Sequence, residues 1–111
     1  MRRITVDEVR AAYEKTGLTP VRHMWLSDNC ACALTACMLS SGVQRKEIAL
    51  AEQQWACDEL ASTTLGLDEA YTDFFTSGFD GCRLGTVTEE EGYGYQDGRA
   101  VAAAIFGEVQ S

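Results

Sequence analysis

Residues 30–41 read "CACALTACMLSS", a stretch that carries no charged side chain. A helix that is apolar on every side is buried inside a domain rather than placed on its surface. Asp28 and Asn29 precede the stretch and favour the N-cap position of a helix, and Gly42 follows it as a stop signal. We therefore expect a helix through these residues to Gly42, at the centre of the fold.

Helical patterns continue on both sides of this central segment. Thr5 and Glu8 have capping-box spacing before the first of them, and Asp68 precedes the cleanest amphipathic stripe. Only residues 21–26 read as extended. Because a single strand cannot make a sheet, we expect an extended linker there, with Trp25 and Leu26 packed against the core. The flanking helices are expected over residues 5–17, 44–64, 67–78 and 89–107.

The chain has 111 residues, of which 46% are hydrophobic, and this is enough for one domain with its own core. The sequence therefore predicts an all-α fold over residues 1–111, a compact bundle of four to five helices around an apolar, Cys-rich central helix. The first residues lack the apolar region of a signal peptide, and no apolar run is long enough to span a bilayer. Five cysteines, an odd number, favour reduced thiols and a cytoplasmic location.

The net charge of −8 is concentrated in the second half of the chain. Residues 1–50 carry seven basic against five acidic residues, whereas residues 51–111 carry two against twelve. Such an acidic half repels nucleic-acid backbones and keeps a protein in solution. We expect a protein partner with a basic surface, and no direct contact with nucleic acid or membrane; a homodimer is left open.

Signatures of catalysis are missing from the sequence. No G-x-S-x-G elbow, phosphate-binding glycine loop or di-iron E-x-x-H pattern occurs. A catalytic pair of Cys30 and His23, oriented by Asp28, would rest on closeness in sequence alone. We therefore expect no catalytic residue, no cofactor and no enzymatic activity.

The cysteines are expected to act as small apolar packing residues. In a helix, Cys30 and Cys32 would point about 200° apart, so they could not hold one metal ion. Paired zinc knuckles are also absent. The alternative is a thiol-based metal-binding or redox protein that uses Cys30 and Cys32 with Cys57 or Cys82 and the only histidine, His23. Within that alternative, Cys30 would react fastest if it lay in the first turn of a helix.

Aromatic residues in the acidic half exceed what a small helical core needs, and aromatic residues anchor protein interfaces. The leading hypothesis is a non-enzymatic interaction module, a regulator or inhibitor of a basic partner. Its expected partner-binding residues, treated as one patch, are Trp55, Tyr93, Tyr95 and Asp97.

Two short segments resemble each other: "GFDG" at residues 78–81 and "GYQDG" at residues 94–98. Glycines four apart on one helix face favour the close approach of a second helix. We interpret the pattern as helix packing, with an ancient helix-pair duplication or a shared ligand-binding edge as alternatives.

Overall fold

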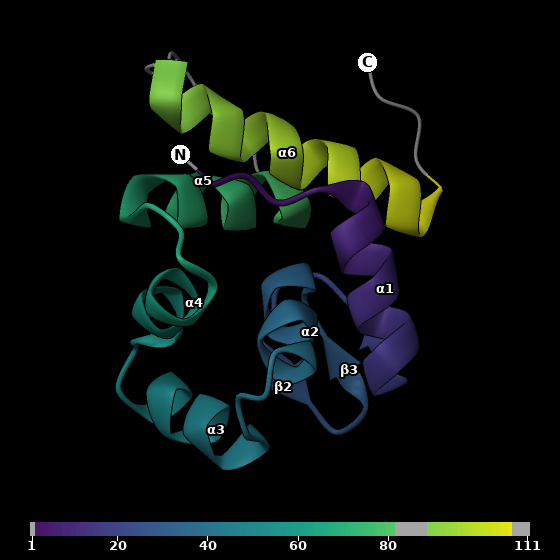
Figure 1. The fold of residues 1–111 in the computed structure, drawn as a ribbon, viewed down its shortest axis with the longest axis vertical. Coiled ribbons are helices and arrows are strands. Elements are labelled where there is room, and N and C mark those ends of the chain that lie inside the picture. Colours follow the sequence, from purple (N-terminus) through teal and green to yellow (C-terminus); the bar gives the residue numbers. More distant parts are fainter. Residues whose placement is uncertain (1, 82–88, 108–111) are drawn as a thin grey trace.

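The computed structural model describes residues 2–81 and 89–107, and these residues form a compact, mostly helical unit with a small sheet (Figure 1). The helices are α1 (Val6–Thr16), α2 (Ala33–Ser40), α3 (Arg45–Gln53), α4 (Cys57–Leu65), α5 (Glu69–Asp80) and α6 (Glu89–Phe106). The strands are β1 (Thr19–Pro20), β2 (Leu26–Ser27) and β3 (Cys30–Ala31). The helical character is thus confirmed, but the fold is not strictly all-α and has one helix more than the predicted four to five.

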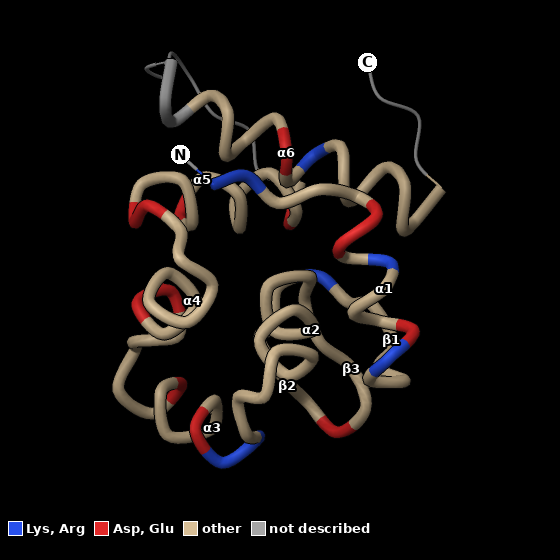
Figure 2. The backbone as a smooth tube through the Cα atoms, in the orientation of Figure 1, with Lys and Arg blue, Asp and Glu red and all other residues tan. Residues whose placement is uncertain are grey.

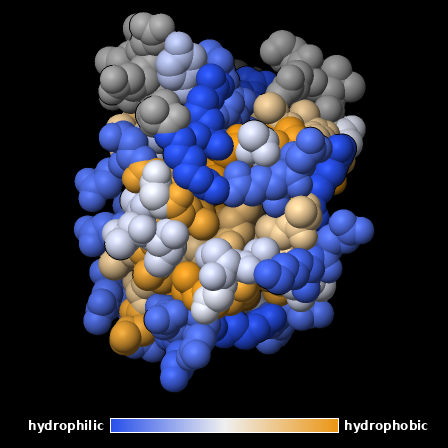
Figure 3. Space-filling view, in the orientation of Figure 1, coloured by the Kyte–Doolittle hydropathy of each residue, from blue (hydrophilic) through white to orange (hydrophobic). Residues whose placement is uncertain are grey.

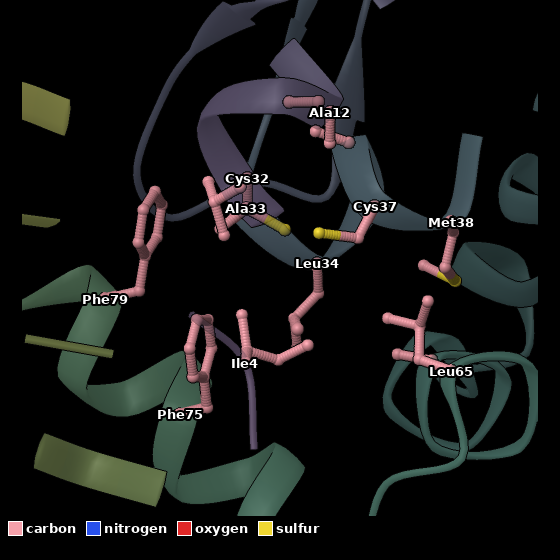
Figure 4. Close-up of a cluster of buried hydrophobic side chains, with 14 of the residues drawn as sticks. Ile4, Ala12, Cys32, Ala33, Leu34, Cys37, Met38, Leu65, Phe75 and Phe79 are labelled. Carbon is pink, nitrogen blue, oxygen red and sulfur yellow. The ribbon is translucent and has the colours of Figure 1, made fainter. Parts of the chain in front are cut away.

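The central position predicted for the Cys-rich helix is confirmed. Every residue of α2 from Ala33 to Met38 is buried, and α2 lies between α1 and α4 in Figure 1. Figure 4 shows Leu34 extending from α2 toward Ile4 of the N-terminal segment and Phe75 of α5. This apolar contact joins the central helix to the α5–α6 pair.

Two predicted helix caps are also confirmed. The Thr5 hydroxyl accepts a hydrogen bond from the Glu8 backbone N–H at 3.1 Å, at the start of α1. The Asp68 carboxylate accepts hydrogen bonds from the backbone N–H groups of Ala70 and Tyr71, at the start of α5. Each cap satisfies N–H groups that have no partner within the helix.

The start of the central helix was predicted wrongly. The helix begins at Ala33 rather than Cys30, and Cys32 occupies the N-cap position with an extended backbone. Asp28 and Asn29 do not cap it, because they form the turn between β2 and β3, where Asp28 has a φ of 50°. A short polar pair that tolerates positive φ favours a tight hairpin turn.

The sheet has the strand order β1-β3-β2. Strand β3 pairs antiparallel with β2, and it pairs parallel with β1. The expected absence of a sheet is therefore wrong, whereas most of the extended run over residues 21–26 is a connection, as expected of a linker, and it joins β1 to β2. Trp25 and Leu26, the last two residues of this run, are partly buried and pack against the core as expected.

The predicted helix over residues 44–64 is divided into α3 and α4. The chain leaves the helical conformation after Gln53 and resumes it at Cys57. Trp55 lies in the break with a φ of 55°, so it does not share a buried helix face with Ile48. This interruption accounts for the additional helix.

Helices α5 and α6 pack backbone to backbone. A Cβ atom on Gly98 would lie 2.1 Å from the carbonyl oxygen of Phe75, and one on Gly94 would lie 2.4 Å from that of Tyr71. Gly78 of α5 faces α6 in the same way. Contacts below 3.0 Å leave no space for any side chain, so these glycines are required for the close approach of the helices. The packing interpretation of the two glycine-rich segments is confirmed.

Within residues 2–81 and 89–107, no helix is both long enough and apolar enough to cross a bilayer.

Candidate interaction surface

An open cleft of about 500 Å³ lies where three segments meet. The β1–β2 connection forms one wall, and the end of α3 and the start of α4 form the other. We call it the Trp55 cleft. Its lining residues are His23, Met24, Trp25, Glu52, Trp55, Cys57 and Asp58.

The Trp55 cleft presents hydrophobic side chains to solvent. Trp55 is 93% exposed and Met24 is 44% exposed. Leu50, also exposed, lies on α3 but outside the lining of the cleft. Figure 3 shows hydrophobic surface among hydrophilic side chains on the side of α3 and α4. Exposed apolar surface with a polar rim is typical of sites that bind a partner or ligand.

Helices α2 and α3 end in the same backbone motif. After α2, the N–H of Gly42 donates to the carbonyl of Leu39 at 3.2 Å, and the N–H of Val43 donates to that of Met38 at 3.0 Å. This pair of bonds is a Schellman motif, which requires a left-handed residue, usually glycine, after the helix. Gly42 meets the requirement with a φ of 111°.

The same motif ends α3, but a tryptophan stands in the place of the glycine. The N–H of Trp55 donates to the carbonyl of Glu52 at 3.2 Å, and the N–H of Ala56 donates to that of Ala51 at 2.8 Å. A bulky residue at positive φ is a conformational outlier that costs about 1–3 kcal/mol. Trp55 offsets none of this cost by burial, because its side chain is almost fully exposed.

A second strained residue lies in the wall of the cleft. His23 has a φ of 67°, and its backbone N–H donates to the Asp80 carboxylate at 2.9 Å, which ties the β1–β2 connection to the end of α5. Of the three non-glycine residues with positive φ in the described part of the chain, His23 and Trp55 both line the cleft, and Asp28 lies in the β2–β3 turn. Strained backbone tends to cluster at functional sites.

The cleft has an acidic rim. Glu52 and Asp58 line it, and none of its lining residues is Lys or Arg. Burial, together with a hydrogen bond to Asp58, raises the pKa of Asp73 on the neighbouring helix α5. In Figure 2, the charged residues of α4 are all acidic, whereas basic residues lie on the N-terminal segment, on α1, in the β1–β2 connection, at the start of α3 and on α6. Negative charge is therefore crowded beside the cleft.

Asp97, expected to bind a partner, is engaged within the molecule. Its carboxylate accepts two hydrogen bonds from Arg3, at 2.9 and 2.7 Å, and one from the Tyr71 hydroxyl at 2.6 Å. The same hydroxyl accepts a bond from the Ile4 backbone N–H at 2.7 Å. Burial and the contact with Asp97 raise the pKa of Tyr71, so the hydroxyl stays protonated and donates.

The two tyrosines of α6 also have partners within the chain. The Arg3 guanidinium lies 4.6 Å from the centre of the Tyr93 ring, and that of Arg99 lies 5.7 Å from the centre of the Tyr95 ring. Helix α6 lies at the opposite end of the molecule from α3 in Figure 1. The structure therefore does not bring Tyr93, Tyr95 and Asp97 together with Trp55 into one patch.

The described cysteines are free, and three of the four are buried. Burial raises the pKa of Cys37 and of Cys57 to about 12 and raises that of Cys32, although a hydrogen bond to Thr35 opposes the shift at Cys32. Figure 4 shows the thiols of Cys32 and Cys37 pointing toward one another beneath α1. Thiols in such surroundings stay protonated near neutral pH and are poor nucleophiles.

Cys30 is the least buried of these thiols, but the expected reason for its reactivity is wrong, because it lies in β3 and not in the first turn of a helix. Of the alternative ligands, only His23 and Cys57 line the Trp55 cleft. Cys82 lies outside the described residues. Within those residues, no group of three or more His, Cys, Asp and Glu side chains is placed to hold a metal ion.

Trp55 was predicted from the sequence as a partner-binding residue, and His23 and Cys57 as alternative metal ligands, but the sequence did not indicate that they line one cleft with Met24, Trp25, Glu52 and Asp58. One signal could have found it: Asp58 and Glu59 follow Cys57 as acidic residues of a first helical turn do, so they indicate a new helix inside residues 44–64. A break at this point would have moved Trp55 from a helix face to a helix end.

Comparisons of the chain with models of protein families, with curated proteins and with solved structures find no match. Function must therefore be inferred from the residues and the geometry of the cleft.

Proposed function

We propose that the protein is a non-enzymatic interaction module that binds a basic protein partner through the Trp55 cleft and thereby regulates or inhibits it. The single observation that carries the proposal is the position of Trp55. A tryptophan that is 93% exposed, held at a φ of 55° where glycine would be unstrained, contributes nothing to the core. Tryptophan is enriched among the residues that contribute most of the binding energy at interfaces, and this role would account for an exposed tryptophan at position 55.

The charge distribution supports a basic partner. Residues 51–111 carry twelve acidic against two basic residues, and Glu52 and Asp58 place part of that charge at the cleft. Complementary charge accelerates association and excludes partners of the wrong sign. A regulator of a basic surface would gain both effects from this arrangement.

The buried thiols favour packing over a thiol-based function. Their raised pKa values disfavour the thiolate, which is the form that attacks disulfides and binds metals. The interaction module is therefore the function that the described geometry supports best.

The proposal is tested by quantitative affinity capture with three forms of the full chain: wild type, Trp55→Gly and Leu50→Ala. Leu50 is a matched control, because it is an exposed hydrophobic residue of α3 outside the cleft. Trp55→Gly is expected to weaken capture of a basic partner by more than about tenfold, as loss of an interface anchor does. Leu50→Ala is expected to retain capture.

The kinetics of the captured complex give a second test. Added salt is expected to slow association much more than it accelerates dissociation, because screening acts mainly on the encounter of opposite charges. Capture that is equal for wild type and Trp55→Gly, or an on-rate indifferent to salt, would contradict the proposal.

A further inference from the structure

We infer that the Trp55 cleft receives an arginine side chain of the basic partner. The guanidinium group of this arginine stacks on an indole ring of the cleft and donates hydrogen bonds to the carboxylates of Glu52 and Asp58. The inference rests on the proposed function, and it identifies the chemical group that the cleft recognises.

The cleft is large enough to admit a long side chain. Its volume of about 500 Å³ falls within the range of about 300–1,000 Å³ that small-ligand sites have. The cleft is open to solvent on one side, because Trp55 and Met24 in its wall are exposed. A side chain that projects from a partner's surface can therefore enter it without any rearrangement of the core.

The lining combines two chemistries that a guanidinium satisfies together. Two indoles, Trp25 and Trp55, supply aromatic faces, and a cation gains about 0.5–2 kcal/mol over such a face, depending on its desolvation. Glu52 and Asp58 supply carboxylate oxygens, which accept the N–H groups of a guanidinium in pairs. A neutral apolar side chain would use the indoles and leave both carboxylates to be desolvated without a partner.

Other cations use this lining less completely. A lysine ammonium is a compact, strongly hydrated charge that does not stack, and a quaternary ammonium cannot donate hydrogen bonds to carboxylates. Arginine alone combines a planar face with a fork of N–H donors. The pairing of indoles with carboxylates therefore selects a guanidinium.

A cation bound at the rim would offset the repulsion between neighbouring carboxylates. Asp58 faces Asp73 across the α4–α5 contact, and the hydrogen bond between them contributes to the raised pKa of Asp73. Asp80, which lies near the wall formed by the β1–β2 connection, already accepts a hydrogen bond from the His23 backbone N–H. A guanidinium at Asp58 would relieve the crowding of negative charge at the start of α4.

The chain offers a direct spectroscopic reading of the cleft. It has two tryptophans, Trp25 and Trp55, and both line the cleft, so both indole N–H resonances report on its occupation. We would titrate the full-length ¹⁵N-labelled protein with three blocked glycine peptides that carry a central arginine, citrulline or lysine. Citrulline has the shape of arginine without its charge. The arginine peptide is expected to shift both indole resonances and to bind at least about tenfold more tightly than the citrulline peptide.

Two variants that remove one negative charge separate the rim from the net charge. Glu52→Gln removes a carboxylate of the cleft, whereas Glu14→Gln removes one from α1, on the other side of α2 (Figure 1). The first is expected to weaken binding of the arginine peptide several-fold, and the second to leave it unchanged within error. Trp55→Gly is expected to abolish binding.

Three results would overturn the inference: equal binding of the arginine and citrulline peptides, tighter binding of the lysine peptide, or indole resonances that no peptide shifts. These failures are distinguishable from a failure of the proposed function. If capture of the partner still depends on Trp55 while the arginine peptide does not bind, the interaction module stands and only the identity of the recognised group is wrong.

Discussion

The α5–α6 interface and the α3–α4 corner use glycine and tryptophan in opposite ways. At the interface, glycine is present where any side chain would collide with the opposite backbone: a Cβ on Gly98 would lie 2.1 Å from a carbonyl oxygen. At the corner, the backbone adopts the conformation that favours glycine, yet the residue is Trp55. Packing explains the first choice and does not explain the second.

This difference separates residues that build the molecule from residues that the fold merely tolerates. Adding a side chain to a glycine of the interface should destabilise the protein, whereas replacing the strained tryptophan with glycine should not. Stability measurements on single substitutions can therefore test whether the corner is a functional region and the interface a structural one.

The largest effect is expected on the face of α5 that packs into the central core (Figure 4). Phe75 is fully buried, so Phe75→Ala should lower the free energy of unfolding by about 3–5 kcal/mol. Phe74, its half-buried neighbour on α5, is the matched control and should lose clearly less on truncation to alanine. Denaturant unfolding measures both. Equal losses would mean that the core-facing side of α5 is not as tightly packed as the burial of Phe75 indicates.

Gly98→Ala should lower the free energy of unfolding by about 1–3 kcal/mol, because the added methyl group forces α6 away from Phe75. Helix propensity alone predicts the opposite sign, a gain of about 0.5–1 kcal/mol for alanine in place of glycine. Thermal unfolding therefore decides between the two by its direction. A control on the same helix is Gln96→Ala, at an exposed position. A stabilised Gly98→Ala protein would remove the structural half of the comparison.

Trp55→Gly should leave the free energy of unfolding unchanged or raise it by up to about 1 kcal/mol, since it relieves strain and removes little buried surface. The reciprocal change in the matching motif, Gly42→Ala, should cost about 1 kcal/mol, because it imposes a side chain on a left-handed residue. Both are measured by denaturant unfolding. A loss of more than about 2 kcal/mol for Trp55→Gly would give the tryptophan a structural role and weaken the case for a binding anchor.

The smallest effect is expected at Asp73, next to the cleft. Burial and the bond to Asp58 raise its pKa, so the charged form is disfavoured in the folded protein, and its contribution to stability is lost as pH rises through the folded-state pKa. Asp73→Asn should raise stability at neutral pH by less than about 1 kcal/mol, because the group is largely exposed. The gain should vanish below about pH 4, where the carboxyl is protonated in both states. Glu14→Gln, at an exposed site, controls for net charge in melting curves across pH.

Local sequence patterns predicted the helices whose evidence is local. The charge-free run of α2 and the Asp68 cap of α5 depend on residues next to each other, and both predictions are confirmed. The hairpin at Asp28 was missed because its residues suit a cap and a turn equally well, and only the pairing of β3 with two other strands decides between them.

The cleft could not be predicted because its walls come from distant parts of the chain. His23 and Trp55 are 32 positions apart in the sequence, and the β1–β2 connection that carries His23 is held by a hydrogen bond to Asp80 at the end of α5. The expected patch of Trp55, Tyr93, Tyr95 and Asp97 does not form for a related reason. Helix α6 packs on α5 and bonds through Asp97 to Arg3 in the N-terminal segment, and spacing along the chain cannot reveal these contacts.

The contact between Arg3 and Asp97 also has a consequence for biosynthesis, because the two residues are 94 positions apart. As the chain leaves the ribosome, α1 and α2 can pack on each other early, since both lie in the first part of the chain. The segment before α1 must wait, because Tyr71 and Asp97, which hold Arg3 and Ile4, are made later. Contacts between distant residues form slowly owing to the entropy of loop closure. Residues that are synthesised before the helices they contact are thus among the last to reach their final place.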